Sequence, residues 1–488
     1  MTKKAAIIGS GAGGIATAIR LALKGMEVAV FEKNSYPGGK IAELNHAQYR
    51  FDTGPSVFTM PRLVDELFEL AGKDPREFFQ YEKLSSSARY FWEDGVVVDS
   101  YGNINDFINE MSLKTSEKSE NIREFLQKSK ELYDLTADVF IFDSIHERMK
   151  MFKKSSLKAL LNFHELNVFS TMHEANKKQF TQGKVVQFFD RYATYNGSNP
   201  YQTPATLNVI PHLEHNTGAF FPEKGMYAIV TALVKLAEKA GVKFYYEDEV
   251  RTLHTSRRKV SHVETTSGVQ PVDYVVSDMD VHYFYKNVLQ NEKNFERLTR
   301  NEKSSSALIF YWGIAREFPE LSLHNILFAE DYEAEFNSLF DKKEIYDDPT
   351  VYIFISAKQV AGDAPKGKEN WYVMINAPEN IGQDWSKLKD KAREKILIKI
   401  ERILKQPVRD FIEFEKVSDP VEIEKQTGAY HGSLYGNSSN GKFAAFNRHL
   451  NFSRQYKGLF FTGGSVHPGG GIPLCFASAK IVANKIKP

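Results

Sequence analysis

A glycine-rich turn between two short apolar segments near the N-terminus constrains the fold more than any other feature of the sequence. Residues 5–8 form an apolar run, which is typical of a parallel strand buried on both faces. Residues 9–14 then carry the pattern GxGxxG, and residues 15–21 repeat apolar positions at helical spacing. A second apolar segment, residues 28–31, ends in the acid Glu32. This order predicts a strand–helix–strand unit that binds a dinucleotide.

Each part of this unit has a mechanical reason. Gly9 allows the tight turn, Gly11 lets a pyrophosphate approach the backbone, and Gly14 lets the helix pack closely on the strand. The N–H groups and the dipole of the helix N-terminus then face the phosphates. Glu32 is placed to accept hydrogen bonds from the adenosine ribose, and an acid there favours a ribose 2′-hydroxyl over a 2′-phosphate.

The segments that follow Glu32 favour FAD over NAD. Pro37-Gly38-Gly39-Lys40 comes directly after it, and Phe51-Asp52-Thr53-Gly54-Pro55-Ser56 comes a short way on. This arrangement is similar to the second fingerprint of the glutathione-reductase-like flavoproteins. Those proteins usually have arginine where this chain has Lys33 and Lys40, and lysine keeps the charge but loses the planar fork.

The C-terminus supplies a third glycine-rich segment. Residues 458–462 predict a strand, and residues 476–486 predict a closing helix. Between them, residues 463–473 hold a run of glycines that lets the backbone approach something flat and closely held. A flexible loop is the alternative, but the apolar strand and helix on either side argue against it.

Composition narrows the classes of protein that this chain can belong to. Its 488 residues exceed what one core usually supports, so we expect two closely associated domains. A formal net charge of +1 argues against a dedicated nucleic-acid binder. The single cysteine, Cys475, cannot form an internal disulfide, which favours a reducing, cytoplasmic setting.

The first residues superficially resemble a signal peptide, because Lys3 and Lys4 precede an uncharged run. The glycines of the turn are poor material for the apolar part of such a peptide, and the dinucleotide-binding unit explains the run better. No stretch of the sequence is long, apolar and poor enough in glycine and proline to predict a membrane-spanning helix. We therefore expect the chain at most to lie on a membrane.

Motifs along nearly the whole chain carry a family resemblance. Besides the N-terminal fingerprint they are Asp52-Thr53-Gly54-Pro55, residues 197–201, 225–227, 275–280 and 363–367, and the ending His467-Pro468-Gly469-Gly470-Gly471-Ile472-Pro473. On these motifs the chain resembles the bacterial-type carotenoid (phytoene) desaturases, which are amine-oxidase-like flavoproteins. Residues 191–195 and 204–207 look more like the hydroxycarotenoid 3,4-desaturases within that family.

The resemblance implies an α/β fold of two domains with discontinuous sequence. Residues 1–80, 220–290 and 425–488 would form a glutathione-reductase-like Rossmann domain that binds FAD. Residues 81–219 and 291–424 would form an α+β substrate domain. Within it, residues 135–180 would form a helical part that faces a membrane.

The predicted FAD site collects residues from the separate segments. They are Gly9, Gly11, Ala12, Gly13, Gly14, Glu32, Lys33, Gly38, Gly39, Lys40, Gly54, Pro55, Ser56, Val250, Gly463, Gly464, Gly471, Ile472 and Pro473. Val250 enters by resemblance, since the backbone at that position contacts the adenine in the family. No set of His, Cys, Asp and Glu stands at metal-ligand spacing, so we expect no metal.

The resemblance implies FAD-dependent introduction of a C–C double bond into a carotenoid, with C-3,4 of a 1′-hydroxycarotenoid as the favoured position. Loss of a hydride leaves an allylic cation that the polyene delocalises, so an apolar, aromatic tunnel suffices without a strong base. Glu147 and Arg148 are candidate catalytic residues by loose resemblance, and a surface ion pair is the alternative. Phytoene desaturation, carotenoid isomerisation, amine or porphyrinogen oxidation and non-catalytic isoprenoid binding are the alternative functions. The bond, the number of steps, the electron acceptor and the oligomeric state stay open.

A basic and apolar stretch, residues 148–169, is a candidate contact with a membrane. Such a stretch can be a helix in an anionic membrane interface, but by itself it favours a packed helix with a solvated basic face. A carotenoid dissolves only in lipid, which makes the two interpretations about equal. The expected location is cytoplasmic, with peripheral association at the inner face of the cell membrane.

Overall fold

A five-stranded parallel sheet is assembled from strands that lie far apart in the sequence. The structure is a computed structural model that describes residues 2–147 and 169–488. The strand order is β19-β13-β1-β2-β9, and all neighbours run parallel. The strands are β1 (Lys4–Ile8), β2 (Glu27–Phe31), β9 (Lys243–Tyr245), β13 (Tyr274–Ser277) and β19 (Leu459–Phe461). Their carboxyl ends meet at one edge, where open α/β sheets bind ligands.

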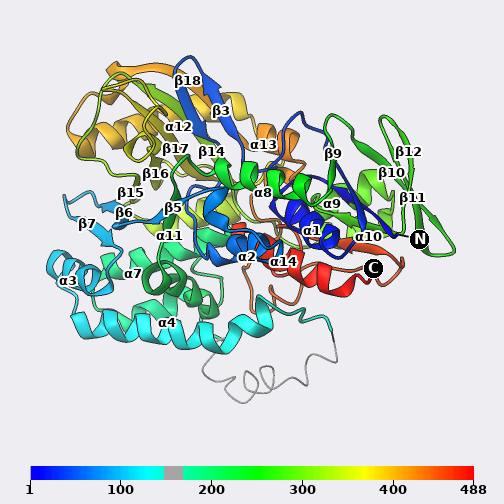
Figure 1. Ribbon diagram of the computed structural model, residues 1–488. Helices are drawn as coiled ribbons and strands as arrows, with labels where there is room; N and C mark the ends of the chain where they lie inside the picture. The colour runs from blue at the N-terminus through cyan, green and yellow to red at the C-terminus, as the bar shows by residue number, and fades with distance from the viewer. Residues whose placement is uncertain (1, 148–168) are drawn as a thin grey trace.

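Both faces of this sheet are covered, which explains the continuous apolar run of β1. Ala5 and Ile7 pack with helices α1, α8 and α14, whereas Ala6 and Ile8 face the antiparallel sheet β10-β11-β12. Figure 1 shows these covering elements gathered at the end of the molecule where both termini lie. They are α1 (Ala12–Ala22), α8 (Tyr227–Lys239), α14 (Ile472–Lys485), β10 (Val250–Ser256), β11 (Lys259–Thr265) and β12 (Gly268–Pro271).

A seven-stranded sheet forms the core of the other half, in the order β18-β14-β17-β16-β15-β6-β7. Every pair is antiparallel except β15 with β6. Strand β14 is buried on both faces: Phe310 and Trp312 pack under α12, whereas Ile309 and Tyr311 face the first sheet's side. The elements are β6 (Ser86–Phe91), β7 (Val97–Tyr101), β14 (Ser306–Ile314), β15 (His324–Leu327), β16 (Val351–Phe354), β17 (Glu369–Ala377), β18 (Ile412–Ser418) and α12 (Trp385–Leu404).

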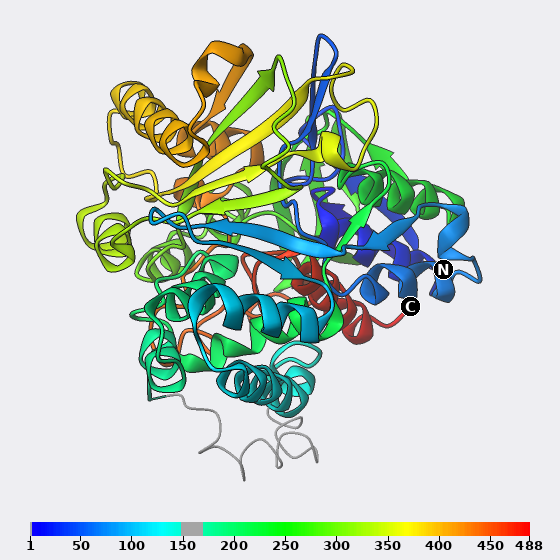
Figure 2. The ribbon, with the colours of Figure 1, turned by 90° about the vertical axis from the view of Figure 1, so that its left-hand side faces the viewer.

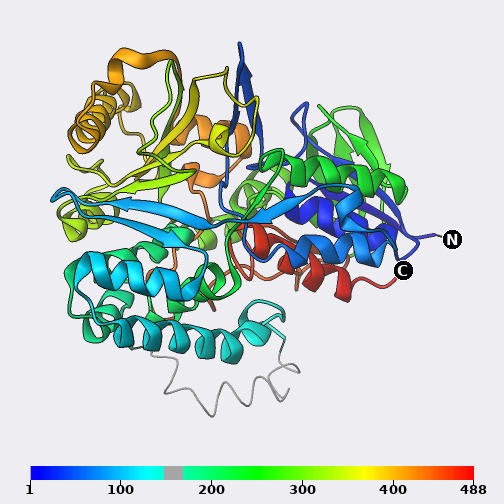
Figure 3. The same cartoon turned by 60° about the vertical axis from the view of Figure 1, so that its left-hand side comes forward.

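A layer of helices packs below the β6–β7 hairpin (Figures 2 and 3). Tyr90 and Trp92 of the hairpin region share a core with Phe107, Phe125 and Phe188 of this layer. The helices are α3 (Ile104–Thr115), α4 (Ser119–Phe140), α6 (Met172–Gln179) and α7 (Gly183–Asp190), followed by the 3₁₀ helix η4 (Arg191–Asn196). The predicted α/β class, with an α+β part beside the Rossmann-type sheet, is therefore confirmed, while the contact of this layer with a membrane stays a prediction.

The remaining elements connect the two halves. Strand β5 pairs with β8, which joins the chain on either side of the helical layer. The elements are α2 (Arg62–Leu70), β3 (Glu43–His46), β4 (Tyr49–Asp52), β5 (Tyr81–Lys83), β8 (Phe220–Pro222), α9 (Val281–Tyr283), α10 (Glu292–Thr299), α11 (Tyr332–Asn337) and α13 (Pro420–Thr427). The strands of the two large sheets fall within the segments assigned to the two predicted domains, but the domain boundaries themselves stay predictions.

Two helices begin earlier than their apolar patterns predict. Helix α14 starts at Ile472 instead of 476, because Pro473 fits the first turn of a helix, where no N–H is needed. Helix α12 starts at Trp385, where the Asp384 side chain caps it by accepting from the Lys387 N–H. Its first turns are largely polar, and its closely spaced buried apolar residues begin only at Ile396.

Within residues 2–147 and 169–488, none of the helices combines the length and the apolar character needed to cross a lipid bilayer.

Candidate functional site

The turn between β1 and α1 has the backbone that binding of a phosphate group requires. Gly9 adopts φ +94°, a conformation that other residues rarely adopt. Gly11 is the N-cap of α1 and offers no side-chain cap, and the first turn of the helix contains no acid. A side chain at Gly14 would collide with the carbonyl oxygen of Gly9. The N-terminus of α1 therefore suits an anion.

Glu32, directly after β2, is bonded to this turn. One carboxylate oxygen accepts hydrogen bonds from the Ser10 N–H at 2.9 Å and the Ser10 hydroxyl at 2.8 Å. The other oxygen accepts from the Asn34 N–H at 2.9 Å. Glu32 thus holds the turn in shape, and its predicted contact with a ribose would come in addition to this role.

The second glycine segment lies against the first. The Gly38 N–H donates to the Ser10 carbonyl at 2.8 Å, and Gly38 forms a bridge with Gly11. A side chain at Gly54 would overlap the carbonyl oxygen of Lys40. Glycine is therefore required at 54 by close packing of two backbone segments.

The two lysines that stand in place of arginines bind backbone carbonyls. The Lys40 ammonium donates to Ser433 at 3.1 Å and to Leu434, and the Lys33 ammonium donates to Lys425 at 3.0 Å. The compact ammonium group of lysine suits such single carbonyl contacts, for which the planar guanidinium group of arginine offers no advantage. Both lysines thereby attach the chain after β2 to the segment that follows β18.

The C-terminal glycine loop runs from the end of β19 to the start of α14. Gly463 adopts φ +93°, and Gly471, the N-cap of α14, adopts φ +114°. A side chain at Gly464 would lie 3.4 Å from the Cα of Gly470. The two ends of the loop therefore approach each other closely, next to the turn after β1.

Asp278, an acid for which the sequence predicted no role, fills the space between these loops. The Asp278 carboxyl group lies where side chains on Gly11, Gly13 or Gly463 would overlap it. Asp278 follows β13, whose neighbours in the sheet are β1 and β19, so the three loops meet at this residue. Burial raises the pKa of Asp278 to about 7, although the Gly14 N–H stabilises the carboxylate. The sequence could have indicated this residue, because Asp278 comes directly after a buried apolar strand, where side chains reach the ligand-binding edge of the sheet.

One cavity of about 470 Å³ connects these segments. Its wall includes every predicted cofactor residue except Gly14, which is buried beneath the turn. The structure thus brings together residues that are predicted from three distant segments, and their contacts with the cofactor stay predictions.

The cavity continues to the face of the seven-stranded sheet, where its wall is rich in aromatic residues. Tyr311, Tyr352 and Tyr372 come from β14, β16 and β17, with Met374 beside them. The ring of Tyr372 makes edge contacts with those of Tyr311 and Tyr352, at centroid distances of 5.6 and 6.2 Å. These rings offer a broad apolar surface beside the glycine-lined part.

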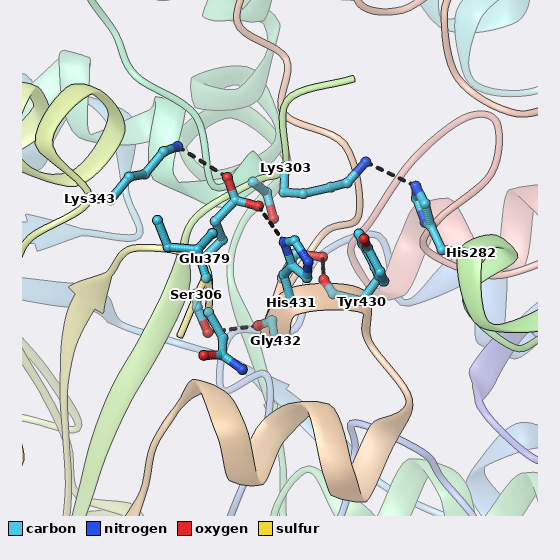
Figure 4. Close-up of polar contacts among 12 residues, drawn as sticks. His282, Lys303, Ser306, Lys343, Glu379, Tyr430, His431 and Gly432 are labelled. Atoms are coloured by element: carbon cyan, nitrogen blue, oxygen red, sulfur yellow. Dashed lines mark hydrogen bonds and ion pairs between the residues drawn. The ribbon is translucent and has the colours of Figure 1, made fainter. Parts of the chain in front are cut away.

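A polar network supports the wall of the cavity from behind (Figure 4). Asp280, which lines the cavity, lies 2.8 Å from His282 Nδ1, and the Lys303 ammonium lies 2.9 Å from His282 Nε2. Burial lowers the pKa of Lys303 to about 8. The His282 ring thus lies between the Asp280 carboxylate and the Lys303 ammonium.

The same network continues to the surface through stacked rings. The Tyr430 ring stacks on His282 at 4.8 Å and on His431 at 4.0 Å. His431 Nδ1 lies 3.0 Å from Glu379, which also forms an ion pair with Lys343 at 3.1 Å (Figure 4). These contacts attach the segment after α13, part of which lines the cavity, to the seven-stranded sheet.

The position of Glu147 does not support its predicted catalytic role. Glu147 forms an ion pair with Lys485 at 3.0 Å and is not among the described residues that line the cavity. Arg148 lies outside the described residues. Their catalytic role stays a prediction. Cys475 does line the cavity, but burial raises the pKa of its thiol to about 12, which disfavours the reactive thiolate.

No group of three or more His, Cys, Asp or Glu side chains within residues 2–147 and 169–488 is arranged to hold a metal ion.

The sequence profile of one protein family matches nearly the whole chain. It is described as flavin containing amine oxidoreductase, and the match covers residues 12–487. The chain belongs to this family. Its cofactor is FAD, and the glycine turn, Glu32 and the cavity described above fit a dinucleotide of this kind. The protein is an FAD-dependent oxidoreductase.

Curated relatives and solved structures resemble this flavoprotein over its full length. It is 48% identical over 484 residues to the 1-hydroxycarotenoid 3,4-desaturase of Flavobacterium sp. (strain P99-3), with 99% of each chain covered. It is 31% identical over 494 residues to the 4,4'-diaponeurosporene oxygenase of Staphylococcus aureus (strain MSSA476), with 100% of this chain and 98% of that protein covered. Wild-type putrescine oxidase with bound putrescine has the same fold, with a TM-score of 0.64 at 12% identity over 99% of this chain and 98% of that one.

Proposed function

We propose that this flavoprotein is a carotenoid desaturase that introduces a C–C double bond at C-3,4 of a 1-hydroxycarotenoid. The observation that carries the proposal is the 48% identity, over 99% of both chains, to a protein named 1-hydroxycarotenoid 3,4-desaturase. The resemblance of residues 191–195 and 204–207 to the same subgroup supports it from the sequence.

The shape of the cavity supports this assignment. It extends without a break from the glycine-lined part to the tyrosines of β14, β16 and β17. When bound, FAD accepts the hydride that the substrate's CH–CH unit loses. Tyr311, Tyr352 and Tyr372 would hold the polyene and exclude water from the cation that hydride loss leaves. The delocalised cation then releases a proton, and no strong base is required to remove it.

Co-expression with a hydroxylated-carotenoid pathway tests the proposal. We expect cells that make a 1-hydroxycarotenoid to accumulate a product with one more conjugated double bond and absorption at longer wavelength. Pigment chromatography with mass spectrometry should show a loss of two hydrogens and no gain of oxygen. A gain of oxygen would instead favour the activity for which the 31% identical relative is named.

Two other results would change the assignment in different ways. Efficient conversion of phytoene with the hydroxylated substrate untouched would contradict the 3,4-desaturase assignment and leave the family membership intact. If flavin-loaded protein in liposomes with an electron acceptor changes neither substrate, the desaturase proposal fails.

We further propose that the protein binds peripherally to the cytoplasmic face of the cell membrane, from which it would take its lipid-soluble substrate. Three exposed phenylalanines support this: Phe169, Phe443 and Phe446 are 72%, 67% and 54% exposed. The Lys442 ammonium lies 5.4 Å from the Phe169 ring centre, which adds positive charge beside the apolar surface. Exposed aromatic and basic residues together are typical of interfacial binding.

Replacing Phe443 and Phe446 by serine should weaken binding to anionic liposomes by about a hundredfold or more, since each buried phenylalanine contributes about 1.5–3 kcal/mol. Flotation of flavin-loaded protein measures the effect, and flavin content should not change. Val269→Ser, at a 57% exposed position on β12, is the control and should bind as the wild type does. Binding that is indifferent to both phenylalanines would contradict this surface. The basic residues Lys150, Lys153 and Lys154, also expected to contribute, lie outside the described residues.

A further inference from the structure

An apolar tunnel cannot by itself decide which bond of a carotenoid is oxidised. A polyene repeats the same units along its length, so sliding by one unit changes few apolar contacts. A polar group on the substrate, bound at a fixed point of the cavity, would set the position of the chain. The cavity has such a point at the end of the helical layer, where Arg191, Tyr195 and Tyr332 line its wall. Arg191 is near enough to Tyr332 for its charge to oppose the rise that burial causes in the pKa of Tyr332.

Arg191 is held by tyrosines and has no carboxylate within ion-pair distance among the described residues. Its Nη2 donates to the Tyr90 hydroxyl at 2.7 Å and to the Tyr195 hydroxyl at 3.3 Å. The Tyr195 hydroxyl in turn donates to Glu214, so the charge of Glu214 reaches Arg191 only through an intervening group. Three tyrosine rings, those of Tyr90, Tyr192 and Tyr195, lie 5.2–5.5 Å from the guanidinium carbon.

Two polar atoms at this point have no hydrogen-bond partner within residues 2–147 and 169–488. They are Arg191 Nε and the hydroxyl oxygen of Tyr332, the first residue of α11. Buried polar groups in native proteins are almost always satisfied, so unpartnered atoms beside a cavity indicate a ligand or a water molecule. Both atoms can donate a hydrogen bond, and the oxygen of a ligand's hydroxyl group can accept two.

This point also adjoins the predicted cofactor site. The Tyr352 hydroxyl is hydrogen-bonded to Ser56, a predicted cofactor residue, and to His324. Burial raises the pKa of Tyr352 and the charge of Arg191 opposes this rise, so the two groups lie within electrostatic range. In a 1-hydroxycarotenoid only two bonds separate C1, which carries the hydroxyl, from C3. A group that binds the hydroxyl must therefore lie next to the group that receives the hydride.

We propose that Arg191 and Tyr332, with Arg191 positioned by Tyr90 and Tyr195, bind the hydroxyl oxygen of the substrate, a tertiary alcohol at the end of a polyene. The guanidinium and the Tyr332 hydroxyl donate to the substrate oxygen. This contact fixes C3 and C4 opposite the flavin and rejects chains that lack the hydroxyl. The inference rests on the proposed desaturase function and assigns the residues that set its specificity.

The test compares two substrates of one carbon skeleton, the 1-hydroxycarotenoid and its analogue without the hydroxyl, with flavin-loaded protein in liposomes and a quinone as acceptor. The measured quantity is the ratio of the two kcat/KM values. Sites built around a substrate hydroxyl reject the analogue that lacks it by about 10⁴-fold. We expect the wild type to favour the hydroxylated substrate strongly.

Tyr332→Phe is the deciding variant, because it removes one oxygen that has no partner among the described residues. Folding, flavin content and melting temperature should be unchanged, while the ratio falls about tenfold through the hydroxylated substrate alone, as expected for one lost hydrogen bond. Arg191→Met should lower the ratio further. Tyr101→Phe, which changes a 38% exposed tyrosine on β7 that does not line this cavity, is the control and should keep the wild-type ratio.

The outcomes separate this inference from the function on which it rests. If the wild type desaturates the hydroxylated substrate but Tyr332→Phe and Arg191→Met keep its preference, the hydroxyl site is wrong and the desaturase function stands. A wild type that converts both substrates equally well would also overturn the site. If the wild type converts neither substrate, the proposed function fails and the inference fails with it.

Discussion

A Gly11→Val variant is expected to purify without FAD. The added side chain would overlap the Asp278 carboxyl group and close the opening at the N-terminus of α1. The overlap and the closed opening both lie where a pyrophosphate must approach backbone N–H groups. No rotamer of valine avoids the overlap, because it begins at the Cβ atom. The absorbance of the purified protein near 450 nm, and the flavin released on denaturation, measure the loss. The predicted cofactor residues that line the described cavity include no His, Cys or Tyr that could anchor FAD covalently, so denaturation of the wild type should release FAD.

Gly183→Val is the matched control for this experiment. Gly183 begins α7, a side chain there meets no atom within 4 Å, and the residue does not require a positive φ. This variant should keep full flavin occupancy, which separates a local effect at the turn from a general effect of replacing glycine. Full flavin occupancy in Gly11→Val would contradict the assignment of residues 9–14 to phosphate binding.

The features that the sequence predicted well are those set by local backbone geometry. The turn at residues 9–14, the glycines at 38 and 54 and the loop at 463–473 each require close approach of backbone atoms, and few other residue types permit this. The apolar run of β1 predicted a strand covered on both faces, and the structure confirms it. Local constraints of this kind are visible in a short window of sequence.

The features that escaped prediction depend on contacts between distant segments. Asp278 belongs to the motif at residues 275–280, but only the order of strands β1, β13 and β19 places its carboxyl group at the glycine turn. The unpartnered atoms of Arg191 and Tyr332 come from two chain segments that meet only in the folded protein. The spacing of residues along the sequence does not show which side chains from distant segments will meet.

FAD affinity should fall as the pH rises above about 7, because of Asp278. Its carboxyl group lies at the turn that receives the negatively charged pyrophosphate, so the protein should bind FAD with this group protonated. Burial raises the pKa of Asp278 from its ordinary value of 3.8 to about 7. Above that pH, binding must take up a proton, and the dissociation constant should rise by about tenfold per pH unit. Titration of apoprotein with FAD between pH 6 and 9 measures this slope.

Asp278→Asn should remove the slope, since the amide has the same shape and carries no charge. The same shift predicts the stability of the apoprotein: between pH 3.8 and about 7 the unfolded chain has lost this proton and the folded chain keeps it. The unfolded state then binds fewer protons, so wild-type stability falls as the pH rises through this window and is constant above it. The asparagine variant should not share this fall, and should therefore melt at a higher temperature than the wild type at pH 8.

Asp273→Asn is the control, because it removes the same charge at the other end of strand β13. Asp273 precedes β13, forms an ion pair with Lys3 at 3.1 Å and lies at the opposite end of the strand from the glycine turn. Its replacement should leave FAD affinity and the pH slope as in the wild type. If the wild-type affinity is flat from pH 6 to 9, or if Asp278→Asn keeps the wild-type slope, the carboxyl group does not share the pyrophosphate site. The three glycines beside it would then serve only to make room for Asp278, and the pyrophosphate would bind along a different part of the turn.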